Sequence, residues 1–323
     1  MFSAIGATAP PTYENAGHNN NLSFIVTDEG VVVVNSGASY QLAAALHEEI
    51  KAITDQPVKL VFNENGQGHA MLGNGYWAEQ GVKVVAHVDA AHEFEENGGQ
   101  SLRAAQTRVK ERADQTQVVA PTETFEDVYA FELGGLQIEA RHLGPSHSPG
   151  DIVVWLPQKS LVIAGDMAFH ERMLPIFPNT MTADWIETWD ANFESLNATY
   201  VIPGHGHPTN MDQVRRYTRD YLVYLHEKIG ALLEEDGDLV DAYYIDQTPY
   251  AHLDTFEELA TKMQAAFMNS WNSSNGLCPL KISVQKGQCF LSGQLPSNCH
   301  SCGCFRAASQ DECHRSLFCG SQW

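Results

Sequence analysis

The sequence has no long hydrophobic run, few cations and, over most of its length, no cysteine. Its longest uninterrupted apolar stretches, such as Val31–Val34, span a few residues, whereas about 20 apolar residues are needed to cross a bilayer. The N-terminal segment that ends at Asn21 contains no basic stretch followed by a long apolar one, so it lacks the pattern of a secretory signal. We therefore expect a soluble protein of the cytoplasm or the periplasm.

Basic residues are much fewer than acidic residues. The chain has 19 lysines and arginines against 40 aspartates and glutamates, which gives a net charge of −21. Nucleic acids and anionic membranes are held by basic patches, so neither is an expected partner. The composition favours a small-molecule substrate, although acidity that serves solubility alone explains the charge equally well.

Cysteine is confined to the end of the chain, where all seven residues lie between Cys278 and Cys319. From Leu277 onward basic residues also outnumber acidic ones. We interpret residues 1–275 as one domain and residues 276–323 as a Cys-rich tail that is a nonnative or disordered extension. The pattern Cys299-His300-Ser301-Cys302 leaves two alternatives open, a small zinc knuckle and a disulfide module.

Hydrophobic periodicity predicts two successive halves, each with hairpin strands followed by alternating helices and strands. Two β-branched runs around the turn Asp28-Glu29-Gly30 predict a hairpin over residues 22–37, and a helix is expected over 39–54. Two such halves predict an α/β protein with two sheets face to face and helices on both outer faces, a four-layer αββα sandwich. Further strands are expected at 60–62, 82–88, 129–133, 136–142, 152–156, 161–164 and 200–202, and further helices at 71–80, 89–112, 184–196, 211–235 and 255–269.

Four loops at the ends of predicted strands offer a histidine or a carboxylate. Loops at strand ends converge in open α/β sheets, so residues far apart in the sequence meet there. Imidazole nitrogen and carboxylate oxygen suit zinc, and catalytic zinc commonly keeps three protein ligands and one open position. We therefore predict that His69, Asp166 and His205 surround one metal ion. The loops read NENGQGH, PSHSPGD, AGD and PGHGH, and their candidate residues are Glu64, His69, His147, Asp166, His205 and His207.

The order of these loops resembles the metallo-β-lactamase-fold hydrolase superfamily over residues 20–236. In that family a strand is followed by H-x-H-x-D-H, then by a GHSPGD-like loop, a strand ending in Gly-Asp, and PGHG. Here SHSPGD, AGD and PGHG match. The first motif differs from the family pattern. Glu64 and Gly66 stand where the family has its two leading histidines, and Gly68 stands where it has the aspartate. Asn35 replaces the usual aspartate after the second hairpin strand. The altered loop is similar to that of zinc metallohydrolases associated with quinoprotein systems.

The resemblance implies two metal sites that share Asp166. The second site retains His69, Asp166 and His205, whereas the first retains His147 and Asp166, with Glu64 as a substitute ligand. Gly66 offers no side-chain ligand, so the number of metal ions, one or two, stays open.

Two residues have more than one interpretation. Glu64 is a metal ligand or a general base, and the alternative is a solvated loop residue. His207 is a candidate catalytic residue that lines the pocket or donates to an oxyanion, and the alternative is a surface position. Asn63, Asn65 and Gln67 are expected to hold their loop by hydrogen bonds. Residues 17–21 precede the first strand, and their polar side chains either face the site or belong to a plain turn, which is the favoured interpretation.

The expected activity is that of a zinc-dependent hydrolase. Bound metal lowers the pKa of water and polarises a carbonyl, so a metal-bound hydroxide would attack that carbonyl. Fold-level analogy gives the substrate class as an ester, lactone, thioester or β-lactam. The alternatives are a catalytically weak metal-binding protein of the same fold and an oxidoreductase that holds iron in the same site.

Overall fold

The computed structural model describes residues 1–177, 179–260, 282–285 and 288–291. The chain forms two compact units, Met1–Ser270 and Trp271–Trp323. The described part of the second unit is an antiparallel pair of strands, β12 (Ile282–Gln285) and β13 (Gln288–Leu291). The predicted boundary at 275/276 and the motif around Cys299 and Cys302 lie outside the described residues.

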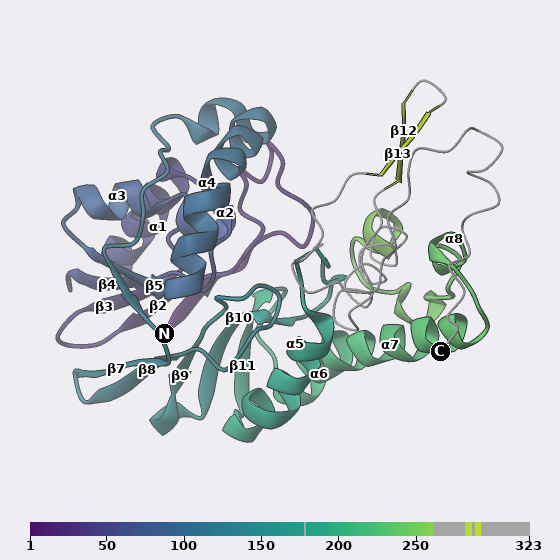
Figure 1. Cartoon of the computed structure of the whole chain (residues 1–323). Coiled ribbons are helices and arrows are strands. Elements are labelled where there is room, and N and C mark those ends of the chain that lie inside the picture. The colour runs from purple at the N-terminus through teal and green to yellow at the C-terminus, as the bar shows by residue number, and fades with distance from the viewer. Residues whose placement is uncertain (178, 261–281, 286–287, 292–323) are drawn as a thin grey trace. The chain divides into compact units, whose positions relative to one another are not determined.

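The first unit is built on two sheets, of which the first holds the N-terminal half of the chain (Figure 1). Its strands run in the order β1-β2-β3-β4-β5-β6. The predicted hairpin is the antiparallel pair β2 and β3, and β3 to β6 then pair in parallel. The bounds are β1 (Phe2–Ala4), β2 (Leu22–Val26), β3 (Val31–Val34), β4 (Val58–Phe62), β5 (Lys83–His87) and β6 (Glu123–Phe125).

The second sheet has the order β11-β10-β9-β8-β7. Its strands pair antiparallel from β7 to β10, and β11 then adds in parallel beside β10. The parallel pair places the ends of β10 and β11 at the same edge of the sheet. The bounds are β7 (Val128–Leu133), β8 (Leu136–Arg141), β9 (Val153–Leu156), β10 (Leu161–Phe169) and β11 (Tyr200–His205).

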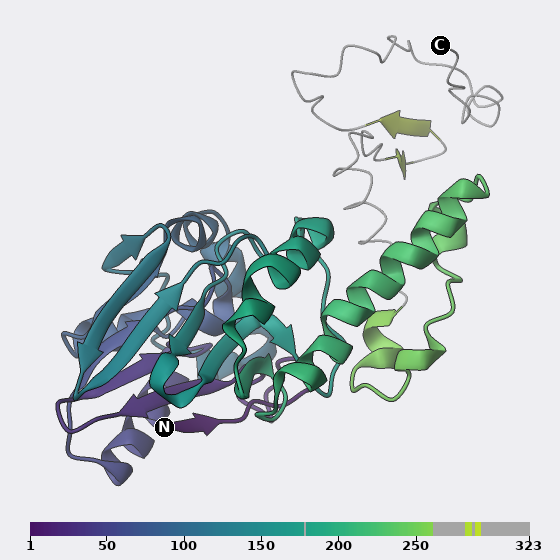
Figure 2. The ribbon, with the colours of Figure 1, turned by 90° about the horizontal axis from the view of Figure 1, so that it is seen from below.

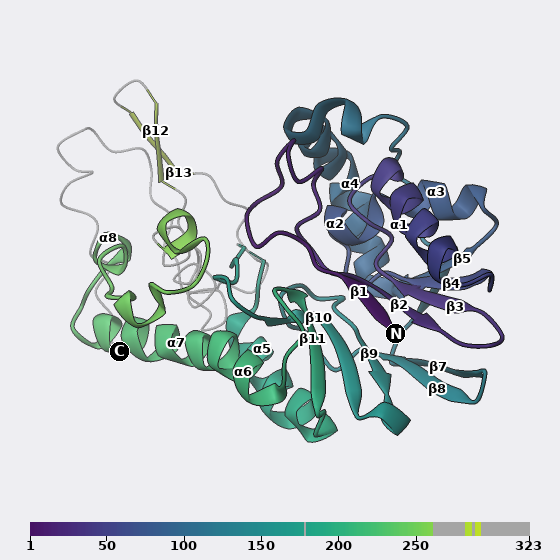
Figure 3. The same ribbon diagram turned by 180° about the vertical axis from the view of Figure 1, so that it is seen from behind.

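Helices cover the outer face of each sheet, as the views from behind and from below show (Figures 2 and 3). Helices α1 to α4 lie beside the first sheet, and α5 and α6 lie beside the second, from which α7 leads away. Among the described residues, no helix is both long enough and apolar enough to cross a membrane. The bounds are α1 (Tyr40–Ile53), α2 (Gly68–Met71), α3 (Asn74–Glu79), α4 (Val88–Val109), α5 (Thr182–Thr188), α6 (Met211–Tyr217), α7 (Arg219–Glu234) and α8 (Leu239–Ala242).

Alternation along β3 shows how one strand serves two cores. Val31 and Val33 pack with α1 and α3, whereas Val32 belongs to the cluster between the two sheets. Successive side chains of a strand point to opposite faces, so an all-apolar strand is what a sheet buried on both sides requires. The predicted αββα sandwich is therefore confirmed.

Tertiary contacts changed several element boundaries. The helix predicted over 211–235 is interrupted at Thr218, whose hydroxyl donates to the Phe169 carbonyl and accepts from the Phe169 amide at 2.8 Å. Strand β10 runs five residues past the predicted 161–164 and so carries Asp166 within the sheet. The short edge strands β1 and β6 were not predicted, because three residues give too little periodicity to detect.

Candidate metal centre

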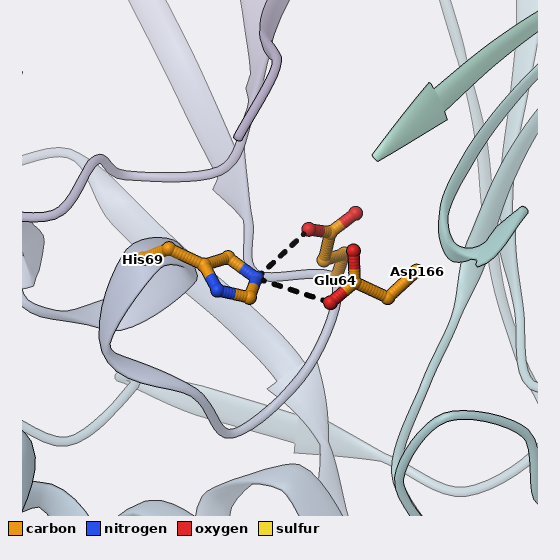
Figure 4. A group of neighbouring side chains, drawn as sticks. All are labelled: Glu64, His69 and Asp166. Carbon is orange, nitrogen blue, oxygen red and sulfur yellow. Dashed lines mark ion pairs between the residues drawn. The ribbon is translucent and has the colours of Figure 1, made fainter. Parts of the chain in front are cut away.

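The predicted loops meet where the strands of the two sheets end. Glu64 follows β4, and His69 lies on the short helix α2. Asp166 lies on β10, His205 closes β11, and His147 lies in the loop before β9. In Figure 4 the His69 ring points toward the carboxylates of Glu64 and Asp166, which come from opposite sheets.

Asp166 is the centre of the cluster. Its Oδ2 lies 3.5 Å from His69 Nε2 and 3.6 Å from His147 Nδ1, and its Oδ1 lies 3.3 Å from His205 Nε2. Glu64 Oε1 lies 3.3 Å from His69 Nε2. Glu64, His69 and Asp166 each offer a ligand atom within 4.8 Å of the other two. The structure thus brings together five of the six residues singled out in the sequence.

Amide side chains hold Glu64 in place. Asn20 donates to Glu64 Oε1 at 2.7 Å, Asn35 donates to Asn20 Oδ1 at 2.8 Å, and the Glu64 amide donates to Asn35 Oδ1 at 3.0 Å. Glu64 is only 2% exposed, so its interpretation as a solvated loop residue is wrong. The interpretation of residues 17–21 as a plain turn is also wrong, because Asn20 is part of this network.

The neighbouring amides fix the rest of the loop, as the sequence predicted. Asn63 donates to the Ala70 carbonyl at 2.7 Å. Asn65 donates to Asp166 Oδ2 at 3.2 Å, and Gln67 Nε2 lies 3.0 Å from His147 Nδ1.

Burial and charge set the protonation of the cluster. Burial lowers the pKa of His147 to about 4, and it also lowers that of His205. Burial opposes ionisation of Asp166, yet His69 and His205 outweigh it and lower the pKa of this carboxyl. Burial would likewise lower the pKa of His69, but the carboxylates of Asp166 and Glu64 raise it overall. Metal binding requires neutral imidazoles around an ionised carboxylate. The pKa shifts of His147, His205 and Asp166 favour these states, whereas the raised pKa of His69 opposes its neutral form.

Several polar atoms of the cluster are buried without a hydrogen-bond partner among the described residues. Such atoms are rare in folded proteins, and each one calls for an explanation such as an ion or water. Nitrogen and carboxylate oxygen donors aimed at one point fit a zinc ion, and they also fit iron. The residues present therefore fit the metal that their pattern predicts. The atoms are Glu64 Oε2, His69 Nε2, His147 Nε2 and Asp166 Oδ1.

His69, His147, Asp166 and His205 of the cluster line one side of a pocket of about 1000 Å³. Helix α4 forms a long wall of this pocket, and Phe177 and Leu259 add apolar surface. Sequence reasoning missed two residues here. Arg172 is buried, and its Nη1 lies 3.3 Å from His205 Nδ1. Glu93 on α4 also lines the pocket. Neither belongs to one of the four strand-end loops, so no motif in the sequence pointed to either residue.

His207 is not brought to the cluster. Its side chain is exposed and its Nδ1 lies 2.7 Å from Glu171 Oε2. It lines a different pocket, of about 780 Å³, together with Tyr217 and His252.

Known proteins resemble this chain in part of its sequence and in its fold. A family model described as the metallo-beta-lactamase superfamily matches residues 68–205. The chain is 24% identical over 244 residues to a linear primary-alkylsulfatase from a Pseudomonas species, a match that covers 63% of this chain and 45% of that protein. It is 26% identical over 196 residues to a type 2 metallo-beta-lactamase from Bacteroides fragilis, covering 56% of this chain and 70% of that protein. The match spans less than half the length of the alkylsulfatase.

Solved structures agree on the architecture. A metallo-beta-lactamase from Pontibacter korlensis superposes with a TM-score of 0.52 at 22% identity, over 63% of this chain and 86% of that one. The metallo-beta-lactamase IND-7 superposes with the same TM-score at 20% identity, over 63% and 85% of the two chains. The segment matched by the family model contains His69, His147, Asp166 and His205, and it begins after Glu64 and Gly66.

Proposed function

We propose that the chain is a member of the metallo-β-lactamase superfamily, whose family model matches residues 68–205, and that it is a zinc-dependent hydrolase of a carbonyl compound. The superfamily is one of metal-dependent hydrolases. The observation that carries the proposal is the cluster of Glu64, His69 and Asp166, whose ligand atoms lie within 4.8 Å of one another, with His147 and His205 in contact with Asp166. Several of these atoms are buried and make no hydrogen bond among the described residues.

The proposed ligands fall into two groups by their distances. Glu64, His69 and Asp166 form the closest donor group. His147 contacts the same oxygen of Asp166 as His69 does, and His205 contacts the other oxygen. When bound, zinc supplies a Lewis acid that polarises a carbonyl and acidifies water. Whether the five residues take one ion or two depends on the first site, where Gly66 contributes no donor.

The protein's own part is to hold these side chains rigidly. Arg172 fixes the face of His205 that points away from Asp166. The His205 ring also stacks on Phe169, with ring centroids 5.1 Å apart and planes 10° apart. Supporting contacts of this kind orient metal ligands and tune their basicity.

Substrate class follows from the relatives' names and from the pocket. The relatives are named for alkyl sulfates, β-lactams and, for the acyl-coenzyme A thioesterase MBLAC2 from Bos taurus, thioesters. A pocket of about 1000 Å³ is at the upper end of the range for small-molecule sites. We propose an ester, lactone, thioester or β-lactam as substrate.

A second candidate is a catalytically weak metal-binding protein of the same fold. It is favoured by the glycines at 66 and 68, which remove a nitrogen donor and a carboxylate from the first motif. This candidate predicts one tightly bound metal and no turnover.

The deciding experiment joins elemental analysis with an activity panel. Purified protein would be assayed for zinc and iron per chain, and tested on esters, lactones, thioesters, β-lactams and alkyl sulfates. We expect bound zinc and hydrolysis of at least one carbonyl class. Asp166→Asn should abolish both, and His92→Gln, at an exposed position of α4, should change neither. Iron with no hydrolysis would favour an oxidoreductase, and metal without turnover would favour the binding protein.

A further inference from the structure

Helix α4 packs closely against the loops that carry Glu64 and His147, and the glycines at 66 and 150 make this packing possible. A Cβ atom added at Gly66 would lie 2.5 Å from the Ala90 carbonyl oxygen and 2.7 Å from Glu93 Cβ. A Cβ atom added at Gly150 would lie 2.2 Å from the Ala90 amide nitrogen. All three distances are far below any real carbon contact, so the first turns of α4 occupy space that side chains at 66 and 150 would need.

The side chain that fills the space beside Gly66 is Glu93. Its Oε2 would lie 2.8 Å from a Cβ atom at 66, and it lines the same pocket as His69, His147 and Asp166. This oxygen is buried, and it has no hydrogen-bond partner in the part of the chain that the structure describes. Burial raises the pKa of the Glu93 carboxyl, although Ser148, His69 and the Gly66 backbone act to lower it. A carboxylate kept in such surroundings costs stability, which is typical of groups retained for function.

Glu93 stands beside the ligand group and not within it. In the described residues, the acidic and histidine side chains that share ligand atoms within 4.8 Å are Glu64, His69 and Asp166. Glu64 and Asp166 also accept hydrogen bonds from Asn20 and Asn65. A carboxylate beyond direct reach of the ligand point, with an oxygen still free to accept, is placed to hold a water molecule there.

We propose that Glu93 is the general base of the reaction, with its Oε2 accepting a proton from the water that attacks the substrate. This inference rests on the proposed hydrolase function. As an O–H bond of water breaks, its proton passes to Oε2 and the water oxygen forms a bond to the carbonyl carbon. The bond from that carbon to the leaving group then breaks, and the leaving group takes the proton from Glu93. The carboxylate is regenerated, and no oxidant or reductant is needed.

The test compares Glu93→Gln with Glu95→Gln, a matched exposed glutamate on the same helix. We expect Glu93→Gln to lower kcat by about 10²–10⁴-fold, the usual effect of removing a positioned acid–base group, while KM changes little. Zinc per chain should stay at the wild-type value. The urea midpoint of the metal-free variant should equal or exceed that of the wild type, because a neutral amide replaces a partly buried carboxylate whose Oε2 has no hydrogen-bond partner among the described residues. Glu95→Gln should match the wild type throughout.

Chemical rescue separates a catalytic role from a structural one. Glu93→Ala leaves room for a small carboxylate, so added formate should restore part of the lost kcat. Loss of zinc from Glu93→Gln, or a lower urea midpoint, would overturn the proposal in favour of a ligand or a structural residue. Unchanged kcat on a substrate that the wild type hydrolyses would overturn it too. Wild-type protein that binds zinc but hydrolyses nothing would instead refute the proposed function, and the zinc and urea measurements would still test Glu93.

Discussion

Replacing Gly66 with alanine should destabilise the protein by about 2–3 kcal/mol, the upper part of the usual range for overpacking. The new methyl group would lie 2.5 Å from the Ala90 carbonyl oxygen and 2.7 Å from Glu93 Cβ, where about 3.5–4 Å is needed for carbon contacts. Relief requires α4 to move by about 1 Å. Ala90 is fully buried and also packs against Gly150. This part of α4 therefore lies between the loop of Gly66 and the loop of Gly150 and has little room to shift.

Urea denaturation of the metal-free protein measures this effect, with Gly230→Ala as the matched control. Gly230 lies within α7, and a Cβ atom there would meet nothing within 4 Å. Alanine should therefore stabilise that helix by about 0.5–1 kcal/mol through its better helix propensity. If Gly66→Ala unfolds within 0.5 kcal/mol of the wild type, α4 does not approach the loop as described. Restoring the family histidine by Gly66→His would then be feasible, whereas the present packing predicts that it fails.

Three further predictions concern charge, pH and the tail. Glu64→Gln should lower turnover by about 10²–10⁴-fold while one metal per chain remains. Kinetics and elemental analysis would measure both quantities. Unchanged turnover would show that Glu64 has no part in the reaction. Burial lowers the pKa of His226 to about 4. Below pH 6.5 the His226 imidazole is therefore protonated in the unfolded chain but stays neutral in the folded protein. Stability should fall by about 1–2 kcal/mol between pH 6.5 and 4, after allowance for partial exposure, and His226→Gln should flatten this slope in urea titrations. Deleting residues 277–323 should leave the melting temperature and metal content nearly unchanged, and loss of one zinc on deletion would show a structural cysteine site.

Much of the fold was predictable because its signals are local and strong. The runs around β3 and β10 are continuous apolar strands, and such runs are what two-sided burial requires. The convergence of His69, Asp166 and His205 followed from the general rule that parallel strands end at one edge. These inferences needed no knowledge of which side chains touch.

The supporting residues could not be predicted, because their roles depend on long-range approach. Arg172 reaches His205 across 33 positions of sequence, and Asn20 reaches Glu64 across 44. Glu93 lies within a polar helix where it resembles its solvated neighbours Glu95 and Glu96. Only the close packing of α4 against Gly66 distinguishes it from them.

Two departures from the family motif are linked by charge. Glu64 replaces a histidine that would be neutral, and Asn35 replaces a residue that would be an aspartate. An aspartate at 35 would still accept from the Glu64 amide, but it could not donate to Asn20 Oδ1 as Asn35 does at 2.8 Å. It would also place a second negative charge near Glu64, whose pKa is already raised by burial and by Asp166. Asparagine both accepts and donates, so it completes the chain of hydrogen bonds through Asn20 that keeps the Glu64 carboxylate in place. The change at 64 therefore requires the change at 35, and the pair is better understood as one altered ligand position than as two separate losses.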